Sequence, residues 1–320
     1  MPINDTTWTM TDGNAGNRRQ ASALAAALGR HAHDWTLDAK PPWRWASPRR
    51  LPASGHAYGA DFAAALHLPP ASRPGLVIGC GRQAALATRL LRRPDTRSVQ
   101  VLAPRIPTRH WDLVIAPEHD GLRGPNVLTL LGSLNPVDDL WLAAGRRDVP
   151  GPGALPGPRT AVLLGGPSAH ARYDEADWEA LLDQIAERVA AEGGSVLATT
   201  SRRTPPGVAR RVRERLGWLP GLVWSDEGDG PNPYAGVLGW ADRIVCTADS
   251  VNMVSEAAAT PAPVFIAGLE GLSGRPRQFV ESLLGRDRVR PLDAHLHPFS
   301  VTPLRETARV AAEVAARLDL

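Results

Sequence analysis

The chain has 320 residues, of which 43% are hydrophobic and 22% are charged, and its formal net charge at pH 7 is +3. This length suits two domains, each with its own core, and the apolar content excludes a wholly disordered chain. Lys40 is the only lysine, and the arginines are interleaved with acidic residues rather than grouped in a basic block. We therefore expect no nucleic-acid partner.

Two cysteines, Cys80 and Cys246, lie in apolar runs that resemble the ends of buried strands. Their small number and their position indicate a reducing compartment rather than a disulfide framework. The N-terminal residues show no signal-peptide pattern, and no apolar stretch approaches the length of a membrane span. These features predict a cytoplasmic protein. They leave a peripheral membrane contact open, and they do not determine the oligomeric state.

Short apolar runs alternate with helical patterns through the first half of the chain. Helices are expected at residues 17–28 and 82–93, each directly after a polar turn. The Trp/Pro-rich segment 35–45 has no periodicity that assigns it to an element. The predicted strands are residues 7–10, 76–79, 99–102, 113–116 and 126–131. Apolar strands separated by helices predict a parallel sheet that is covered on both faces.

The strongest boundary signal is the run of proline and glycine that ends at Arg159. So much proline and glycine cannot continue a helix or a central strand, which is typical of an interdomain linker. We therefore predict an N-terminal domain over residues 1–145, a linker over 146–159 and a C-terminal domain over 160–302. Residues 303–320 form a terminal helical segment.

The alternation of strands and helices restarts after the linker. Asp174 is expected to cap a helix whose apolar residues recur at helical spacing from Trp178 to Val189. The predicted strands are residues 161–164, 195–198, 222–224, 243–246 and 263–266. The whole chain is therefore expected to be an α/β protein of two doubly wound, Rossmann-like domains facing a cleft. Such domains bind ligands at the carboxyl ends of their strands.

Four turns in the second half follow predicted strands and are rich in small polar residues. Helix N-termini attract phosphate, paired guanidinium groups suit a diphosphate, and a carboxylate can bind sugar hydroxyls. For any one of these turns alone an ordinary solvated turn is the preferred explanation, and it is the four together at one sheet edge that favour a ligand site. The candidate binding residues are Gly165, Gly166, Ser168, Thr200, Ser201, Arg202, Arg203, Asn232, Tyr234, Thr247, Asp249, Ser250, Asn252, Met253, Ser255 and Glu256. Neither a GxGxxG fingerprint nor a P-loop is present.

In the first half, the glycine-bearing turn that begins at Asp12 opens a helix and could face an anion or a sugar. Asp12 is a candidate general base, although an ordinary N-terminal turn acid is the preferred explanation for it. His119 beside Asp120 is a second candidate, because a histidine next to a carboxylate can accept a proton near neutral pH. The remaining histidines lack a convincing set of metal-ligand partners, so we predict no metal site.

These motifs resemble the mitochondrial fission (elongated mitochondria) family, in its bacterial members. The run Thr-Ala-Asp-Ser-Val-Asn at 247–252 is the most informative of them. The segments that carry the resemblance are residues 11–17 with Gln20, 77–82, 118–127, 200–205, 232–234, 247–257 and 273–279. The resemblance covers almost the whole chain. It implies a GT-B-like fold in which the terminal helix crosses back onto the first domain.

The family is similar to nucleotide-sugar glycosyltransferases, and this similarity implies a nucleotide-diphosphate site on the C-terminal domain. The acceptor side would then lie on the N-terminal domain, with Gly13, Gly16, Asn17, Gln20, Gly79 and Gly81. The expected activity is transfer of a sugar from a nucleotide-diphosphate donor to an unknown acceptor, without a metal ion or another cofactor. The alternatives are a nucleotide-sugar epimerase and a non-catalytic interaction scaffold with a vestigial site.

Overall fold

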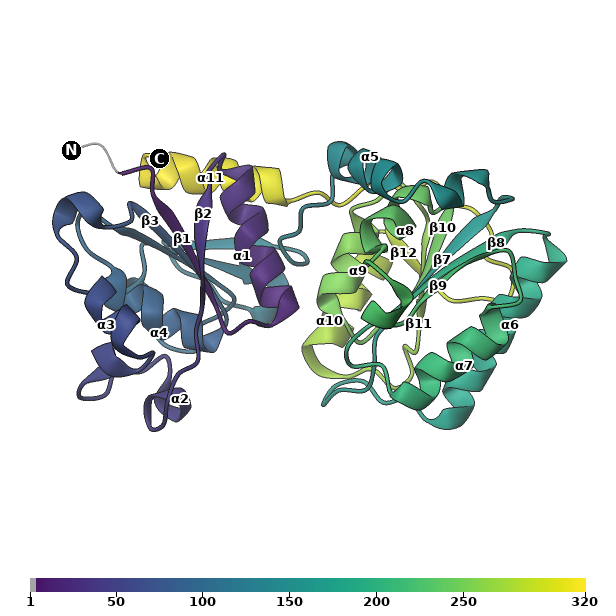
Figure 1. Ribbon diagram of the computed structural model, residues 1–320, viewed down its shortest axis with the longest axis horizontal. Helices are drawn as coiled ribbons and strands as arrows, with labels where there is room; N and C mark the ends of the chain where they lie inside the picture. The colour runs from purple at the N-terminus through teal and green to yellow at the C-terminus, as the bar shows by residue number, and fades with distance from the viewer. Residues whose placement is uncertain (1–3) are drawn as a thin grey trace. The chain divides into compact units, whose positions relative to one another are not determined.

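The computed structural model describes residues 4–320, which form two compact units (Figure 1). The first unit comprises the described residues up to Pro136 together with Glu306–Leu320, and the second unit is Val137–Arg305. The second unit therefore already contains the proline- and glycine-rich residues 146–159, which the sequence analysis expected to link two domains.

Packing explains why the second unit begins so early. Helix α5, Asp139–Asp148, packs against α8, Tyr234–Trp240, and a Cβ on Gly145 would lie 2.5 Å from the Ala235 carbonyl group. The following residues are held as well, because the Trp240 ring donates to the Val149 carbonyl oxygen at 2.8 Å. The proline- and glycine-rich run is thus an ordered cover over α8.

The first unit contains a six-stranded parallel sheet in the order β2-β1-β3-β4-β5-β6. The five strands predicted in this half are present, and β2 is an addition. Strand β2 lies at the edge of the sheet with His33 and Asp34 exposed, so it lacks the apolar run of a buried strand. The strands are β1 Thr7–Thr11, β2 Ala32–Thr36, β3 Leu76–Cys80, β4 Arg97–Val101, β5 Leu113–Pro117 and β6 Val127–Leu130.

Helices cover both faces of this first sheet. They are α1 Ala15–Ala27, α3 Ala60–Ala65, α4 Arg82–Leu91 and α11 Thr307–Leu318, while the one-turn helix α2, Trp43–Ala46, lies in a loop beyond them (Figure 1). Figure 1 shows α11, in yellow, beside α1, in purple. Val310, Val314 and Leu318 of α11 are buried in the same cluster as Leu24 of α1. The terminal helix therefore returns to the first unit, as the family resemblance implied.

The second unit contains another six-stranded parallel sheet, in the order β12-β11-β10-β7-β8-β9. All five strands predicted in this half are present, and the three-residue edge strand β12 is an addition. The strands are β7 Arg159–Leu164, β8 Ser195–Thr200, β9 Gly221–Trp224, β10 Arg243–Thr247, β11 Val264–Ala267 and β12 Val289–Pro291. Two doubly wound sheets thus confirm the predicted fold class.

The remaining helices of the second unit are α6 Glu175–Ala191, α7 Pro206–Leu216, α9 Val251–Ala258 and α10 Gly274–Leu284. Asp174 caps α6 as predicted, because its carboxylate accepts the Asp177 N–H at 2.8 Å while the Asp177 side chain accepts the Asp174 N–H. The buried stripe of α6 runs from Trp178 to Val189 and packs on the sheet. No helix of residues 4–320 is long and apolar enough to cross a bilayer.

An ion pair between the first residue of β10 and the end of α6 predicts a pH-dependent stability. Arg243 is 5% exposed, its Nε donates to the Thr160 hydroxyl at 2.9 Å, and its guanidinium pairs with Glu192. Burial acts to raise the pKa of Glu192, but the hydrogen bonds and charges of Arg243 and Arg188 together outweigh it, so this pKa lies below its ordinary value of 4.5. A carboxylate with a lowered pKa contributes stability above its unfolded pKa and loses it as the pH falls through the folded pKa.

We expect Glu192→Gln to lower the free energy of unfolding by about 2 kcal/mol at pH 7, because Arg243 would keep its charge in a buried place without a counter-ion. The difference from the wild-type chain should shrink as urea unfolding is repeated at pH values that fall from 4.5 through the lower folded pKa of Glu192, because the folded carboxylate becomes protonated there. A difference that does not change with pH would contradict this assignment.

Candidate functional site

The candidate site of the second unit lies where the strand order of its sheet reverses. Strand β7 has β8 on one side and β10 on the other, so the helices that follow β7 and β10 leave on opposite faces of the sheet. In doubly wound sheets the ligand binds outside the carboxyl ends of the two strands at such a switch point. The turns after β7 and β10 carry Gly165, Gly166, Thr247 and Asp249.

Asp249 is the centre of this arrangement. Its side chain has no exposed area, and its carboxylate accepts the Gly166 N–H at 3.1 Å, the Thr247 hydroxyl at 2.7 Å and the Arg203 guanidinium at 2.6 Å. A Cβ on Gly165 would lie 2.1 Å from the same carboxylate, so only glycine fits there. Asp249 therefore holds the turns after β7, β8 and β10 together, whereas we expected it to contact the ligand.

The turn after β8 is fixed by a residue that the sequence analysis did not select. The Thr204 hydroxyl contacts the Gly165 carbonyl oxygen at 2.5 Å and accepts the Ser201 N–H at 2.9 Å. Arg202 is exposed, and the side chain of Arg203 is 44% exposed in spite of its bond to Asp249. The two guanidinium groups thus extend from a turn whose backbone is held by hydrogen bonds to Thr204.

The backbone of this turn approaches the turn after β7 closely. A Cβ on Gly166 would lie 2.1 Å from the Arg203 carbonyl oxygen, so the second glycine of the pair is also required. Thr200 is engaged on the other side, where its hydroxyl donates to the Ser225 carbonyl oxygen at 2.8 Å. Thr204 could have been identified by its hydroxyl in a polar turn and by its place in the family segment 200–205.

Helix α9 begins directly after β10. Ser250 is its N-cap and accepts the Met253 N–H at 3.4 Å, and Asn252 and Met253 are half-buried in the first turn. The first N–H groups of a helix have no partners within the helix, and they carry the positive end of its dipole. Ser255 donates to the Val251 carbonyl oxygen at 2.7 Å, so its hydroxyl is directed at the helix backbone.

A buried carboxylate follows one position later on α9. Glu256 is 1% exposed and accepts the Tyr234 hydroxyl at 2.7 Å. Tyr234 in turn is the first residue of α8, and its N–H donates to the Asn232 side chain at 3.0 Å. The structure thus brings Asn232, Tyr234 and Glu256 together from two predicted turns that are distant in sequence.

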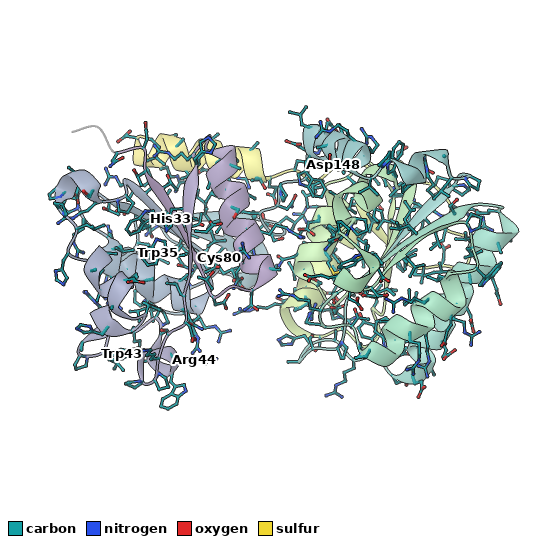
Figure 2. All side chains as sticks on the ribbon, in the orientation of Figure 1. His33, Trp35, Trp43, Arg44, Cys80 and Asp148 are labelled. Atoms are coloured by element: carbon teal, nitrogen blue, oxygen red, sulfur yellow. The ribbon has the colours of Figure 1, made fainter. Side chains whose placement is uncertain are left out.

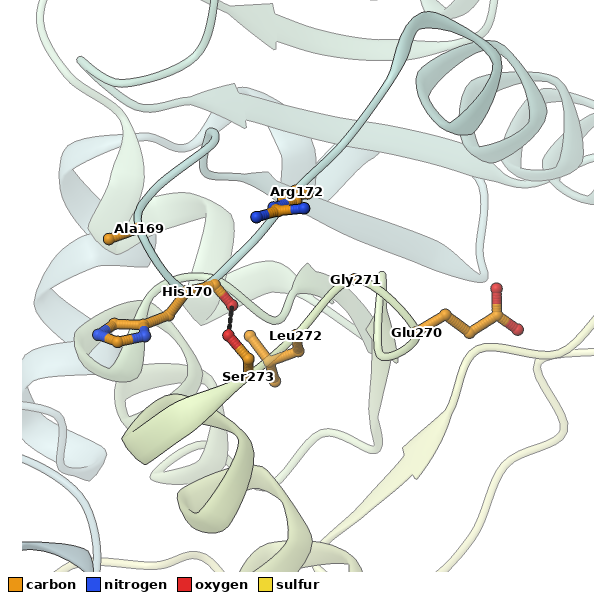
Figure 3. Close-up of a pocket in the computed structure, with 7 residues that line it drawn as sticks. All are labelled: Ala169, His170, Arg172, Glu270, Gly271, Leu272 and Ser273. Carbon is orange, nitrogen blue, oxygen red and sulfur yellow. Dashed lines mark hydrogen bonds between the residues drawn. The ribbon is translucent and has the colours of Figure 1, made fainter.

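A hollow of about 300 Å³ lies between the loops that follow β7 and β11 (Figure 3). Figure 3 shows His170, Leu272 and Ser273 gathered at one end, with Glu270 directed away from them. Ser168 is exposed at this loop, and its hydroxyl accepts the His170 N–H at 3.1 Å. Of the residues around this hollow, only Ser168 and the family segment that begins at Ser273 are predicted from the sequence.

Tyr173 is a further residue that the sequence analysis did not select. Its ring lies 4.8 Å from the Trp178 ring, and a Cβ on Gly268 would lie 2.2 Å from it. Burial raises the pKa of Tyr173, and the negative charge of Asp249 acts in the same direction. The phenol therefore stays protonated at neutral pH beside the turn after β11.

The first unit has its own switch point, between β1 and β3. Asp12, after β1, accepts the Asn17 side-chain amide at 2.9 Å. A Cβ on Gly81, after β3, would lie 2.7 Å from the same amide nitrogen, and both Gly13 and Gly81 have a positive φ. The structure thus brings the candidate base Asp12 together with three of the predicted acceptor-side residues, Gly13, Asn17 and Gly81.

Two other residues selected in the first unit, Gly79 and Gln20, are part of its packing. A Cβ on Gly79 would lie 2.7 Å from the Thr88 side chain, so this glycine lets α4 approach β3. Gln20 is 4% exposed, and Gly16 lies within the first turn of α1.

His119 and Asp120 lie in a short helical turn after β5. Because β3 and β4 stand between β1 and β5, three strand spacings, or about 14 Å, separate this turn from that of Asp12. The two candidate bases are therefore separate alternatives and do not form one catalytic group. Among residues 4–320, no group of three or more His, Cys, Asp or Glu side chains could hold a metal ion.

The fold and the two switch points define a class of protein, the two-domain α/β proteins of GT-B type. The structure of UDP-GlcNAc 2-epimerase from Methanocaldococcus jannaschii has a TM-score of 0.54 at 12% identity and covers 96% of this chain and 91% of its own. The S. aureus MnaA-UDP co-structure has a TM-score of 0.52 at 12% identity, covering 98% and 97%. At such low identity these likenesses show the fold alone.

Sequence comparison shows the family to which the chain belongs. The family model described as "Mitochondrial fission ELM1" matches residues 15–318, and the chain belongs to that family. The Mitochondrial fission protein ELM1 of Arabidopsis thaliana is 33% identical over 281 residues, which are 76% of this chain and 65% of the plant protein. The match therefore spans just under two thirds of the plant protein.

Proposed function

We propose that this protein binds a nucleotide-diphosphate sugar on its second unit and transfers the sugar to an acceptor. The observation that carries the proposal is the joining of three strand-to-helix turns by the Asp249 carboxylate, directly beside the first turn of α9. This arrangement lies at the switch point of the sheet, where doubly wound domains bind their ligands.

The diphosphate is proposed to lie on the turn after β7 and on the N–H groups that follow Ser250. Arg202 and Arg203 would offset the charge that grows on the diphosphate as the glycosidic bond breaks. Of these groups, Arg203 is held by Asp249 before the reaction. Groups that are fixed in advance can stabilise the transition state more than they stabilise the bound sugar nucleotide. The proposal includes neither a metal ion nor another cofactor.

The sugar or ribose is proposed to bind at Glu256. Its carboxylate already accepts one hydroxyl, that of Tyr234, at 2.7 Å, and a carboxylate can accept further hydroxyl groups. For the acceptor we propose Asp12 of the first unit as the general base, with His119 and Asp120 as the competing choice. Asp12→Asn and His119→Ala, assayed separately for turnover, distinguish the two.

Titration calorimetry against a panel of nucleoside diphosphates tests the donor site. We expect one nucleotide to bind, and we expect Ser250→Ala combined with Glu256→Ala to weaken that binding by at least about 100-fold, because a helix cap and a charged hydrogen-bonding group are both lost. Glu214→Ala is the matched control, because that side chain is 61% exposed on α7. A wild-type chain that binds no nucleotide would overturn the proposal.

Incubation of the wild-type protein with candidate sugar nucleotides separates the possible reactions. Transfer requires an acceptor and releases the nucleotide, whereas epimerisation changes the sugar without an acceptor. Turnover only in the absence of an acceptor would replace our proposal with an epimerase. Nucleotide binding without either reaction would favour a scaffold that retains a vestigial site.

A further inference from the structure

The segment between Asp38 and Asp61 contains no acidic residue and carries a concentration of positive charge. In the first unit it forms the loop that includes the one-turn helix α2. Figure 2 shows Trp43 and Arg44 of this helix at the lower end of the unit, away from its sheet. The proposed transferase function does not use this loop, which we call the α2 loop and define as residues 39–53.

The two tryptophans of α2 have opposite environments. Trp43 is half-buried, packs against the cluster that contains Phe62, and donates from its ring to the Pro52 carbonyl oxygen at 3.0 Å. Trp45 is 72% exposed. Residues two apart on a helix point in nearly opposite directions, so the anchoring of Trp43 holds the Trp45 ring out in solvent. Figure 1 shows α2 projecting beyond α3 and α4.

Two arginines of α4 tie the loop to the body of the unit. Arg82 donates to the Trp45 carbonyl oxygen at 3.4 Å, and Arg89 donates to the Pro48 carbonyl oxygen at 3.2 Å. Both acceptors are uncharged backbone oxygens. The two guanidinium groups therefore add their positive charge to that of the loop, and neither charge is neutralised by these bonds. The exposed Trp45 ring is thus held next to positively charged arginines.

The other cations of the loop have no counter-ion in the described part of the chain. Arg44, Arg49 and Arg50 are exposed, and no carboxylate of residues 4–320 lies within ion-pair distance of them. Burial lowers the pKa of Arg89, and the positive charges of Arg50 and Arg109 act in the same direction. Like charges therefore accumulate around the loop, and an anionic partner would relieve them.

We propose that the α2 loop docks this protein on an anionic lipid surface, with the Trp45 ring at the level of the headgroups and Arg44, Arg49 and Arg50 against the lipid phosphates. An amphipathic indole ring prefers the membrane interface, and clustered arginines bind anionic headgroups. A single-stranded nucleic acid would instead require several rings exposed in succession for base stacking. Only Trp45 is exposed here, because Trp43 packs inward.

Vesicle flotation with the full chain tests this proposal. We expect binding to phosphatidylcholine vesicles that contain phosphatidylglycerol, no binding to phosphatidylcholine alone, and release at high salt. Trp45→Ala should lower the bound fraction at least about fivefold through the loss of the interfacial ring. Arg49→Glu combined with Arg50→Glu should lower it about tenfold or more.

Exposed residues of the second unit provide matched controls. Trp218 is 65% exposed, and the side chains of Arg147 and Arg210 are 77% and 74% exposed. Trp218→Ala and the double variant Arg147→Glu, Arg210→Glu should float as the wild type does. A wild-type chain that fails to bind anionic vesicles, or Trp45→Ala binding as the wild type does, overturns the proposal. RNA binding in an electrophoretic shift without vesicle binding would assign the α2 loop to nucleic acid and also overturn it.

Discussion

Asp249→Ala should lower the free energy of unfolding of the second unit by about 3 kcal/mol. The substitution removes the common acceptor of the Gly166 N–H, the Thr247 hydroxyl and the Arg203 guanidinium, and the first two of these donors are buried. Arg203 is half-exposed and can turn to water, so the expected loss lies at the lower end of the range for a broken buried ion pair. Urea unfolding followed by circular dichroism measures it.

The same variant tests the link between this carboxylate and the ligand site. Nucleotide affinity should fall together with stability, because the turns after β7, β8 and β10 lose their common support. Asp249→Asn keeps one acceptor oxygen and should recover part of both losses. A stable Asp249→Ala variant with unchanged nucleotide affinity would show that the three turns keep their positions without the carboxylate.

Arg288→Met should have an effect of similar or greater size, about 3–5 kcal/mol. Arg288 is 5% exposed, and its guanidinium donates to the Ala258 carbonyl oxygen at 2.8 Å and to that of Thr260 at 2.7 Å. These carbonyl groups lie at the end of α9, where the positive charge also complements the negative end of the helix dipole. Burial lowers the pKa of Arg288 to about 10, so the group remains charged at neutral pH.

Urea unfolding of Arg288→Met, Arg288→Lys and Arg210→Met measures this contribution. Lysine should restore little of the lost stability, because a single ammonium group cannot reproduce the planar fork that serves several carbonyl groups. Arg210→Met is the control, since that side chain is 74% exposed and should change stability by less than about 0.5 kcal/mol. Equal stabilities of the methionine variants at the two positions would contradict the role assigned to Arg288.

The strand content of the fold could be predicted because buried parallel strands are continuous apolar runs. The two strands that were not predicted, β2 and β12, are edge strands that carry polar residues, whereas the other two edge strands, β6 and β9, are apolar runs and were predicted. The boundary between the units was misplaced for a different reason. Proline and glycine are typical of a linker between domains. Here glycine is required at positions 145 and 153 for another reason, because α8 packs so closely that a side chain would not fit.

The candidate site could be predicted as a set of turns, because polar residues after apolar strands gather at one edge of a parallel sheet. The role of each residue in these turns could not be predicted from the sequence. An aspartate in the turn after β10 could equally contact a ligand or support the turn, and the sequence does not distinguish the two. Its three hydrogen bonds within the protein show that Asp249 supports the turns. Thr204 and Tyr173 were missed because their partners lie on other strands and other loops.

The return of α11 to the first unit has a consequence for the order in which the chain folds. Residues 137–305 leave the ribosome before Glu306–Leu320, so the second unit can be completed while the first still lacks its last helix. Until α11 arrives, the surface that Val310 and Val314 cover is open to water or to a chaperone. Completion of the first unit is thus delayed until the second has been synthesised.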